Sequence, residues 1–433
     1  MLPSRCAIAV VGGGPAGFMA AICAAEAKPA PGRIVLLEAT AEPLHKVLIS
    51  GGGRCNVTHA CWDPRLLVGH YPRGGRALHG PFERFAPGDT LDWFARHGLQ
   101  LVEEPDGRLF PRSNRSSSVV ESLRRAALAA GVELVTTAAV TAVRRCPDGF
   151  ALQWRQGGAL TAQRLVVATG SHPSGHRLVA SLGHGLVAPV PSLFSLALGS
   201  AELTQLAGLA MDPVALELVP PPSAAATRPR SGSRHRQQGA VLITHRGLSG
   251  PAVLRLTAFA ARDLRQWGYR GQLRLDWSGG LGRDWLEQRF AEARQQQARR
   301  RLDQWRPWPA LARRLWWLLL AQQGLGLQGQ PLPRWADLSR VQQQGLMQRL
   351  LDSRLEITGR GPFGEEFVTA GGIPLGEVNL ATMESRRCPG LYLAGEILDV
   401  DGVTGGFNFQ HCWTSGWLAG QALARTTQSA AAE

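Results

Sequence analysis

Lysine is almost absent from this chain, whose 433 residues contain only Lys28 and Lys46. Arginine therefore carries nearly all of the positive charge, and the formal net charge is +14. Long apolar runs are also missing, since none reaches the roughly 20 residues that a membrane-spanning helix needs. The N-terminus has no signal-peptide pattern, because its short apolar stretch at 6–11 leads directly into glycines. We therefore expect a cytoplasmic protein with no membrane partner.

The cysteines do not form the pattern of a disulfide framework. They are seven in number and widely scattered, which argues against regular pairing. Cys55, His59 and Cys61 are close enough in sequence to suggest a metal site, but no C-x-x-C pair accompanies them. We therefore expect no bound metal.

The first 27 residues have the pattern of a dinucleotide-binding unit. An apolar run at 6–11 predicts a buried parallel strand, a G-x-G-x-x-G follows it, and a helical stretch begins at Phe18. The glycines permit a tight turn, close approach of a pyrophosphate, and close packing of helix on strand. The free N–H groups at the helix N-terminus favour phosphate binding. We expect the cofactor to contact Gly12, Gly14, Pro15, Ala16 and Gly17.

Further strands extend this unit toward the adenosine end of a cofactor. The apolar stretch 33–38 ends in Glu38, which lies 21 residues after Gly17, near the spacing of a ribose-binding carboxylate. The stretch 165–170 is a strand that ends in Ala168, Thr169 and Gly170, and Val140 begins another that we expect beside the adenine.

Two further glycine-rich blocks suit a large planar or anionic ligand, because bare backbone can approach it closely. The first contributes Lys46, Ser50, Gly51, Gly52, Gly53, Arg54 and Asn56. The second contributes Gly395, Glu396, Asp399, Gly405, Gly406, Phe407 and Asn408. The second block precedes a helix predicted over 409–424, whose N-terminus would face the edge of a flavin where negative charge develops on reduction. For Asn408, capping of this helix is an alternative role.

On these motifs the chain resembles the BaiN-like (aminoacetone oxidase-type) FAD-dependent flavoprotein family. The resemblance also rests on Gly-Leu-Ser-Gly-Pro-Ala at 247–252 and Thr-Ala-Gly-Gly-Ile at 369–373, and it covers residues 8 to 190 and 358 to 424 approximately. It implies a non-covalent FAD, with the ADP half held at 12–17 and Glu38, and Asp399 near the ribityl chain. Members are assigned different substrates, namely steroid carbon–carbon double bonds, an amine, and uridine in ribosomal RNA.

The pattern of segments predicts an α/β fold, a Rossmann-like two-dinucleotide FAD-binding domain with an inserted small β-barrel and a helical subdomain. We expect the FAD-binding domain at 1–190 and 353–433, the barrel at 191–279 and the helical subdomain at 280–352. The sequence leaves the oligomeric state open.

The positive charge is concentrated in the insertion. Residues 191–350 contain 22 arginines and 10 acidic residues, a net charge of +12, whereas the rest of the chain has a net charge of +2. Tryptophans at 305, 308, 316, 317 and 335 alternate with the densest arginine runs. The insertion therefore either contacts ribosomal RNA or is a solvated basic face whose tryptophans form a helix core.

We expect an FAD-dependent oxidoreductase that delivers hydride from flavin N5 to an electron-poor C=C bond, with uridine in ribosomal RNA as one possible substrate. Only one G-x-G-x-x-G is present, so NAD(P)H would enter the substrate cleft itself, or another donor would serve. Cys55 is the first candidate for the proton donor, or else it only packs against the cofactor; His411 and Glu396 are weaker candidates. Arg54 either orients the flavin or binds an anionic substrate.

Three alternatives to RNA reduction stay open. A reductase or amine oxidase of small molecules would need only the flavin domain. An RNA-binding assembly factor would have a vestigial flavin site. A disulfide reductase is disfavoured, because the spacing of Cys55 and Cys61 is loose and a separate NADPH domain is missing.

Overall fold

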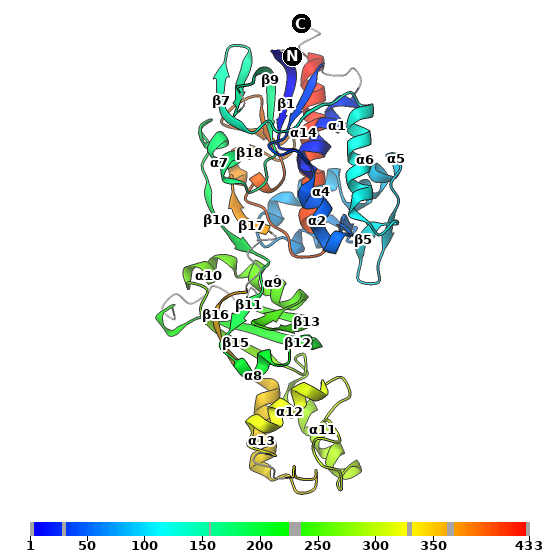
Figure 1. Cartoon of the computed structure of the whole chain (residues 1–433), viewed down its shortest axis with the longest axis vertical. Helices are drawn as coiled ribbons and strands as arrows, with labels where there is room; N and C mark the ends of the chain where they lie inside the picture. Colours follow the sequence, from blue (N-terminus) through cyan, green and yellow to red (C-terminus); the bar gives the residue numbers. More distant parts are fainter. Residues whose placement is uncertain are drawn as a thin grey trace. The chain divides into compact units, whose positions relative to one another are not determined.

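The computed structural model describes residues 4–27, 32–155, 157–224, 235–326, 331–361 and 368–429. The chain divides into two compact units, of which unit 1 comprises Met1–Pro189 and Thr369–Glu433 and unit 2 comprises Val190–Val368 (Figure 1). Among the described residues, no helix is long and apolar enough to cross a membrane.

Unit 1 is built on a largely parallel sheet with the strand order β18-β19-β20-β9-β1-β2-β6. Its centre is β1 (Arg5–Val11), which pairs in parallel with β2 (Ile34–Leu37) and β9 (Ala159–Val167). All four residues of β2 are buried, as expected for a strand covered on both faces. This confirms the predicted Rossmann-like core.

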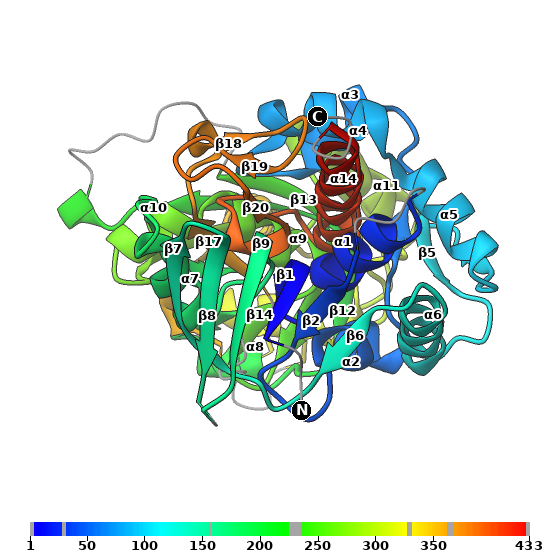
Figure 2. The same cartoon turned by 90° about the horizontal axis from the view of Figure 1, so that it is seen from above.

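The two ends of the chain meet beside this sheet. Helix α1 (Pro15–Ala25) packs against α14 (Phe407–Ser429), and Figure 2 shows them side by side. Glycines permit the close approach, since a Cβ on Gly416 would lie 2.6 Å from the Ala16 carbonyl oxygen. The C-terminal helix is thereby brought against the helix of the first glycine motif.

The remaining elements of unit 1 are shorter and surround this core. The helices are α2 (His45–Gly53), α3 (Pro64–Leu67), α4 (His79–Arg84), α5 (Pro87–Arg96), α6 (Ser116–Ala129) and α7 (Pro173–Ala180). The strands are β3 (Thr58–His59), β4 (Leu101–Glu103), β5 (Arg108–Pro111), β6 (Glu133–Val135), β7 (Val140–Cys146), β8 (Gly149–Trp154), β18 (Val378–Asn379), β19 (Glu384–Ser385) and β20 (Leu391–Leu393). The chain leaves unit 1 along β10 (Val187–Ser192) and returns along β17 (Val368–Gly372), and these two strands pair.

Unit 2 contains a closed barrel with the order β11-β14-β13-β12-β15-β16. The strands are β11 (Leu196–Leu198), β12 (Ala210–Val219), β13 (Arg236–Thr244), β14 (Gly247–Ser249), β15 (Gly271–Asp276) and β16 (Ser353–Arg360). Helices α8 (Ala201–Thr204), α9 (Pro251–Phe259) and α10 (Ala261–Gln266) accompany them, and a helical segment follows with α11 (Gly282–Gln296), α12 (Arg313–Gln322) and α13 (Arg340–Leu351). The predicted inserted barrel is confirmed.

One predicted boundary is wrong. We expected the chain to re-enter the flavin domain at residue 353, but Ser353–Arg360 is β16, which pairs with β15 and β11 and closes the barrel. The flavin unit resumes at Thr369. Only Ile357 of this strand is fully buried, so its apolar alternation is weak, and the helical segment separates it from the other barrel strands in the sequence. The first predicted boundary, at 190, agrees with the structure within one residue.

Candidate functional site

The first glycine loop closes tightly onto β9 and leaves one open face. A Cβ on Gly12 would lie 2.5 Å from the Ala168 carbonyl oxygen, and one on Gly17 would lie 2.0 Å from the Gly12 carbonyl oxygen. At Gly14, by contrast, a Cβ would meet only the Ala168 oxygen, 4.0 Å away. Gly14 is also the N-cap of α1 and makes no side-chain cap bond. The loop thus offers an open helix N-terminus of the kind that binds a pyrophosphate.

Glu38 lies directly after β2 and faces this loop. Its carboxylate accepts hydrogen bonds from the backbone N–H of Gly13 at 2.7 Å and from the N–H and hydroxyl of Thr40, each at 2.8 Å. The side chain is therefore held beside the glycine loop, where a ribose-binding acid is expected.

The predicted adenosine-end residues belong to neighbouring strands. Ala168 follows β9 and is buried, and Gly170 has a φ of +62°. The Thr169 hydroxyl is buried and has no hydrogen-bond partner among the described residues. Val140 is the first residue of β7 and is 8% exposed. These residues thus lie at or directly after the ends of neighbouring strands.

The glycine block at 50–56 forms an exposed turn of bare backbone. The helical backbone of α2 breaks at Ser50, and Gly51, Gly52 and Gly53 have φ values of +56°, +67° and +82°. A Cβ on Gly52 or Gly53 would meet no atom within 4 Å. The adjacent Leu48 and Ile49 are exposed by 37% and 51%. This surface of backbone and apolar side chains fits a broad planar ring.

The Arg54 side chain joins this block to neighbouring residues of unit 1. Its guanidinium pairs with Glu104, donates to the Asn114 side-chain oxygen at 2.5 Å, and lies 3.9 Å from the centre of the Phe110 ring. These contacts support an orienting role for Arg54 over the alternative of binding an anionic substrate.

Polar contacts join the C-terminal glycine block at 395–408 to the glycine block at 46–56. The Lys46 ammonium lies 2.9 Å from the Glu396 carboxylate, whose other oxygen accepts from the N–H of Thr369 at 3.0 Å. The Asn56 side chain in its hydrogen-bonded orientation accepts from the N–H of Gly406 at 3.1 Å. Residues 350 positions apart thus line one region of unit 1.

A cluster of three rings lies at the start of α14. The ring centre of Phe407 is 4.8 Å from that of His59 and 4.2 Å from that of His70, and the two histidine centres are 6.0 Å apart. The Phe407 carbonyl accepts from the Tyr71 hydroxyl at 2.6 Å. His59 Nδ1 is buried without a partner in the described part of the chain. Sequence reasoning missed His70 and Tyr71, because no motif surrounds them.

Several polar residues of this region serve the fold. Asn408 both accepts from the Gly402 N–H at 2.8 Å and donates to its carbonyl at 2.9 Å, so it closes the loop before α14, and neither of these bonds caps the helix. The buried Gln410 side chain accepts from the hydroxyls of Thr58 and Thr90. Asp399 lies in the same loop, and its N–H donates to the Ile373 carbonyl at 2.9 Å.

Two of the three proposed proton donors, Cys55 and His411, are buried, whereas the Glu396 side chain is 18% exposed and pairs with Lys46. Cys55 is fully buried, and burial raises the pKa of its thiol to about 12. His411 is 2% exposed, burial lowers its pKa to about 4, and its Nε2 lies 3.3 Å from the Gly395 carbonyl. Neither side chain is exposed, and the role of Cys55 as proton donor stays a prediction.

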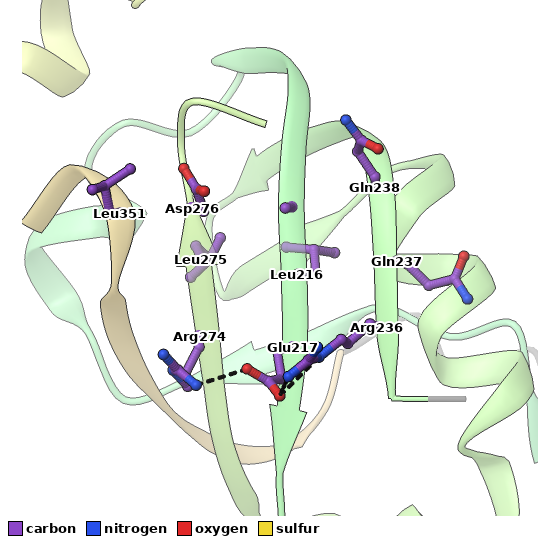
Figure 3. A pocket seen from close by; sticks show the side chains of 10 residues that line it. Leu216, Glu217, Arg236, Gln237, Gln238, Arg274, Leu275, Asp276 and Leu351 are labelled. Atoms are coloured by element: carbon purple, nitrogen blue, oxygen red, sulfur yellow. Dashed lines mark hydrogen bonds and ion pairs between the residues drawn. The ribbon is translucent and has the colours of Figure 1, made fainter. Parts of the chain in front are cut away.

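A separate hollow of about 420 Å³ lies on the barrel wall of unit 2. Figure 3 shows Glu217 between Arg236 and Arg274, with both ion pairs at 2.7 Å. Because its arginines are already paired, this hollow has little free charge. No cluster of three or more metal-binding side chains occurs among the described residues.

The open glycine surfaces of unit 1 fit an FAD, with the ADP half at Gly14 and Glu38 and the flavin against residues 50–56. The fold and this site therefore define a two-dinucleotide-type flavoprotein.

Comparison with known proteins indicates the same class of protein. Residues 6–422 match the family described as HI0933-like protein Rossmann domain, and the chain belongs to this family of FAD-dependent oxidoreductases, which confirms the resemblance.

Two relatives have the same level of identity. The 3-dehydro-bile acid delta(4,6)-reductase of Clostridium scindens is 30% identical over 428 residues, which are 96% of this chain and 98% of the relative. The ribosomal RNA dihydrouridine synthase of Escherichia coli is 30% identical over 430 residues, which are 96% and 97% of the two chains. The solved 3-ketosteroid-delta4-(5alpha)-dehydrogenase from Rhodococcus jostii RHA1 shares the fold, with a TM-score of 0.51 at 14% identity over 98% of each chain.

Proposed function

We propose that this FAD-dependent oxidoreductase reduces the C5=C6 double bond of uridine in ribosomal RNA. The observation that carries the proposal is the distribution of charge, because 191–350 has a net charge of +12 and the rest of the chain +2. A substrate that is a polyanion would be attracted by this insertion, whereas a small neutral substrate would not need it. The name of the Escherichia coli relative supports the same substrate.

The chain's own residues bind and orient the cofactor. Gly14 and the N-terminus of α1 would hold the pyrophosphate, Glu38 the ribose, and the bare backbone at Gly52 and Gly53 the flavin ring. When bound and reduced, FAD would supply a hydride to C6 of uridine, and C5 would take up a proton from an acid of the site or from water. The N-terminus of α14 would present its N–H groups and positive dipole end to the edge of the flavin where negative charge develops on reduction.

The electron donor is part of the proposal. The described chain has one dinucleotide-binding sheet, and it is the one assigned to FAD. We propose that NAD(P)H reduces the flavin by entering the substrate site itself, so that donor and substrate alternate. Steady-state kinetics would then show parallel lines in double-reciprocal plots.

A second candidate is the reduction of a conjugated double bond in a small molecule. It is favoured by the bile acid reductase of Clostridium scindens, which is as similar to this chain as the RNA-modifying relative. In this case the basic insertion would be only a solvated cover. The alternative of amine oxidation by oxygen has no comparable support.

The test is the dihydrouridine content of ribosomal RNA from cells with and without the gene. We expect the modified base to disappear without the gene and to return with the intact gene. A Gly14→Glu variant should not restore it, because the new side chain occupies the open face where a pyrophosphate would lie. Unchanged dihydrouridine would reject the proposal, and purified flavoprotein would then be assayed with enones.

A further inference from the structure

Four exposed arginines lie on two neighbouring stretches of the helical segment of unit 2, three at 299–301 and one at 334. Residues 298–302 run antiparallel to 333–336, with a bridge between Arg301 and Arg334 and a hydrogen bond from the Trp335 N–H to the Arg300 carbonyl at 3.0 Å. The arginine cluster, as we call it, consists of Arg299, Arg300, Arg301 and Arg334, all of which are exposed.

This cluster has an excess of positive charge. Arg301 pairs with Asp303 at 2.9 Å, whereas no carboxylate lies within ion-pair distance of Arg299, Arg300 or Arg334 among the described residues. The whole segment 281–351 contains twelve arginines and five acidic residues. Such unpaired like charges repel one another, and an anionic partner would remove this cost.

Buried tryptophans hold the cluster in place. The Trp316 indole N–H donates to the Leu302 carbonyl at 2.7 Å, and the rings of Trp316 and Trp335 stack with an angle of 7° between their planes. Both rings are fully buried, as expected for a helix core. The arginines therefore extend from a fixed backbone, which lowers the entropy lost when they bind a ligand.

One tryptophan beside the cluster is not part of this core. Trp305 is 38% exposed, and the Arg300 guanidinium lies 5.7 Å from its ring centre. Nucleic-acid bases stack on exposed aromatic rings and guanidinium planes, while adjacent arginines bind the phosphates. A ligand with both phosphates and bases would therefore use the arginines and the Trp305 ring together.

We infer that the arginine cluster and Trp305 form a surface that binds single-stranded RNA. The arginines contact successive phosphates, and Trp305 stacks on an unpaired base. The inference rests on the proposed RNA substrate. It specifies which part of the insertion contacts the RNA, and it specifies that this surface prefers unpaired RNA.

The test uses a fluorescein-labelled RNA hairpin with an unpaired uridine loop and the FAD-loaded protein without an electron donor. Fluorescence anisotropy measures the Kd at several salt concentrations. A triple variant with Arg299, Arg300 and Arg334 changed to glutamine should bind more weakly. The slope of log Kd against log salt should fall by as much as about 2, since each phosphate contact on a single strand contributes about 0.7. The matched control changes three exposed arginines of unit 1, Arg124, Arg125 and Arg144, to glutamine.

The stacking step has its own variants. Trp305→Ala should weaken binding of the hairpin about tenfold but leave binding of a fully paired duplex unchanged, and Trp305→Phe should retain most of the affinity. Polyglutamate, which has charge but no bases, should compete poorly. FAD content and melting temperature establish that each variant is folded.

The outcomes separate this inference from the proposed function. Equal loss of binding in the cluster and control variants, or unchanged binding in the cluster variant, would overturn the inference, as would polyglutamate that competes as well as RNA. Dihydrouridine that depends on the gene would still support the function in that case. Conversely, cluster-dependent RNA binding without any effect of the gene on dihydrouridine would reject the function alone.

Discussion

Arg73 and Asp401 form an ion pair inside unit 1, although they lie 328 positions apart in the sequence. The Asp401 side chain is fully buried and that of Arg73 is 11% exposed. Their backbones also form an isolated antiparallel bridge. The pair joins the segment before α4 to the loop that leads into α14. Asp401 lies inside the C-terminal glycine block, but nothing in the sequence predicts that it pairs with Arg73.

Asp401→Asn should destabilise the protein, because it removes the buried carboxylate that pairs with the Arg73 guanidinium. Loss of one partner of a buried pair typically costs about 3–5 kcal/mol. Thermal unfolding should show a lower Tm, and the double variant Arg73→Met/Asp401→Leu should recover much of the loss. Asp148→Asn, which removes the partner of the exposed Arg5, is the control and should hardly change Tm. Equal losses of Tm in Asp401→Asn and Asp148→Asn would contradict a stabilising role for the Arg73–Asp401 pair.

Substitutions at Gly14 and Gly17 should separate cofactor binding from folding. Gly14→Glu fills open space and should abolish FAD binding while the apoprotein stays folded. Gly17→Ala places a Cβ 2.0 Å from the Gly12 carbonyl and should lower the stability of the apoprotein as well. The flavin absorbance spectrum and apoprotein melting temperature measure the two effects. Normal FAD content in the Gly14 variant would place the pyrophosphate elsewhere.

His411 should make the protein less stable in mild acid. Burial lowers the pKa of the folded imidazole from 6.5 to about 4. The unfolded chain therefore takes up this proton first as pH falls, and stability decreases between about pH 6.5 and pH 4, by at most about 3 kcal/mol. Denaturant unfolding across this range should show a shallower pH dependence for His411→Gln than for the wild type. Identical slopes would mean that other groups cause the acid sensitivity.

Cys55 should be unreactive in the native protein. Its thiol is fully buried and burial raises its pKa to about 12, whereas Cys146 is partly exposed. Mass spectrometry after brief alkylation at neutral pH should find Cys146 modified and Cys55 unmodified. Cys55→Ala should keep the pH profile of substrate reduction. Alkylation of Cys55 in the native protein, or a Cys55→Ala variant that loses the fall in reduction rate at high pH, would support Cys55 as the proton donor.

Sequence reasoning succeeded where function depends on local backbone geometry. The glycines at 12–17 and 51–53 need conformations or close approaches that a Cβ would prevent, so their spacing alone predicted a dinucleotide loop and a bare surface. Buried parallel strands likewise have continuous apolar runs, which placed β1 and β2. The boundary at 353 failed because β16 pairs with strands that lie far away in the sequence and has little apolar pattern of its own.

The sequence by itself predicted a dinucleotide-binding motif, the Rossmann-like core and the concentration of arginine in the insertion, since these depend on residue type and short spacing, and the choice of FAD came from the family resemblance. Only the tertiary structure decided which side chains meet. It buried Cys55, paired Arg73 with Asp401, and left Trp305 exposed while Trp316 and Trp335 became core. Burial and long-range pairing follow from how distant segments pack, and neighbouring residues in the sequence, such as Trp316 and Trp317, can have opposite environments for that reason.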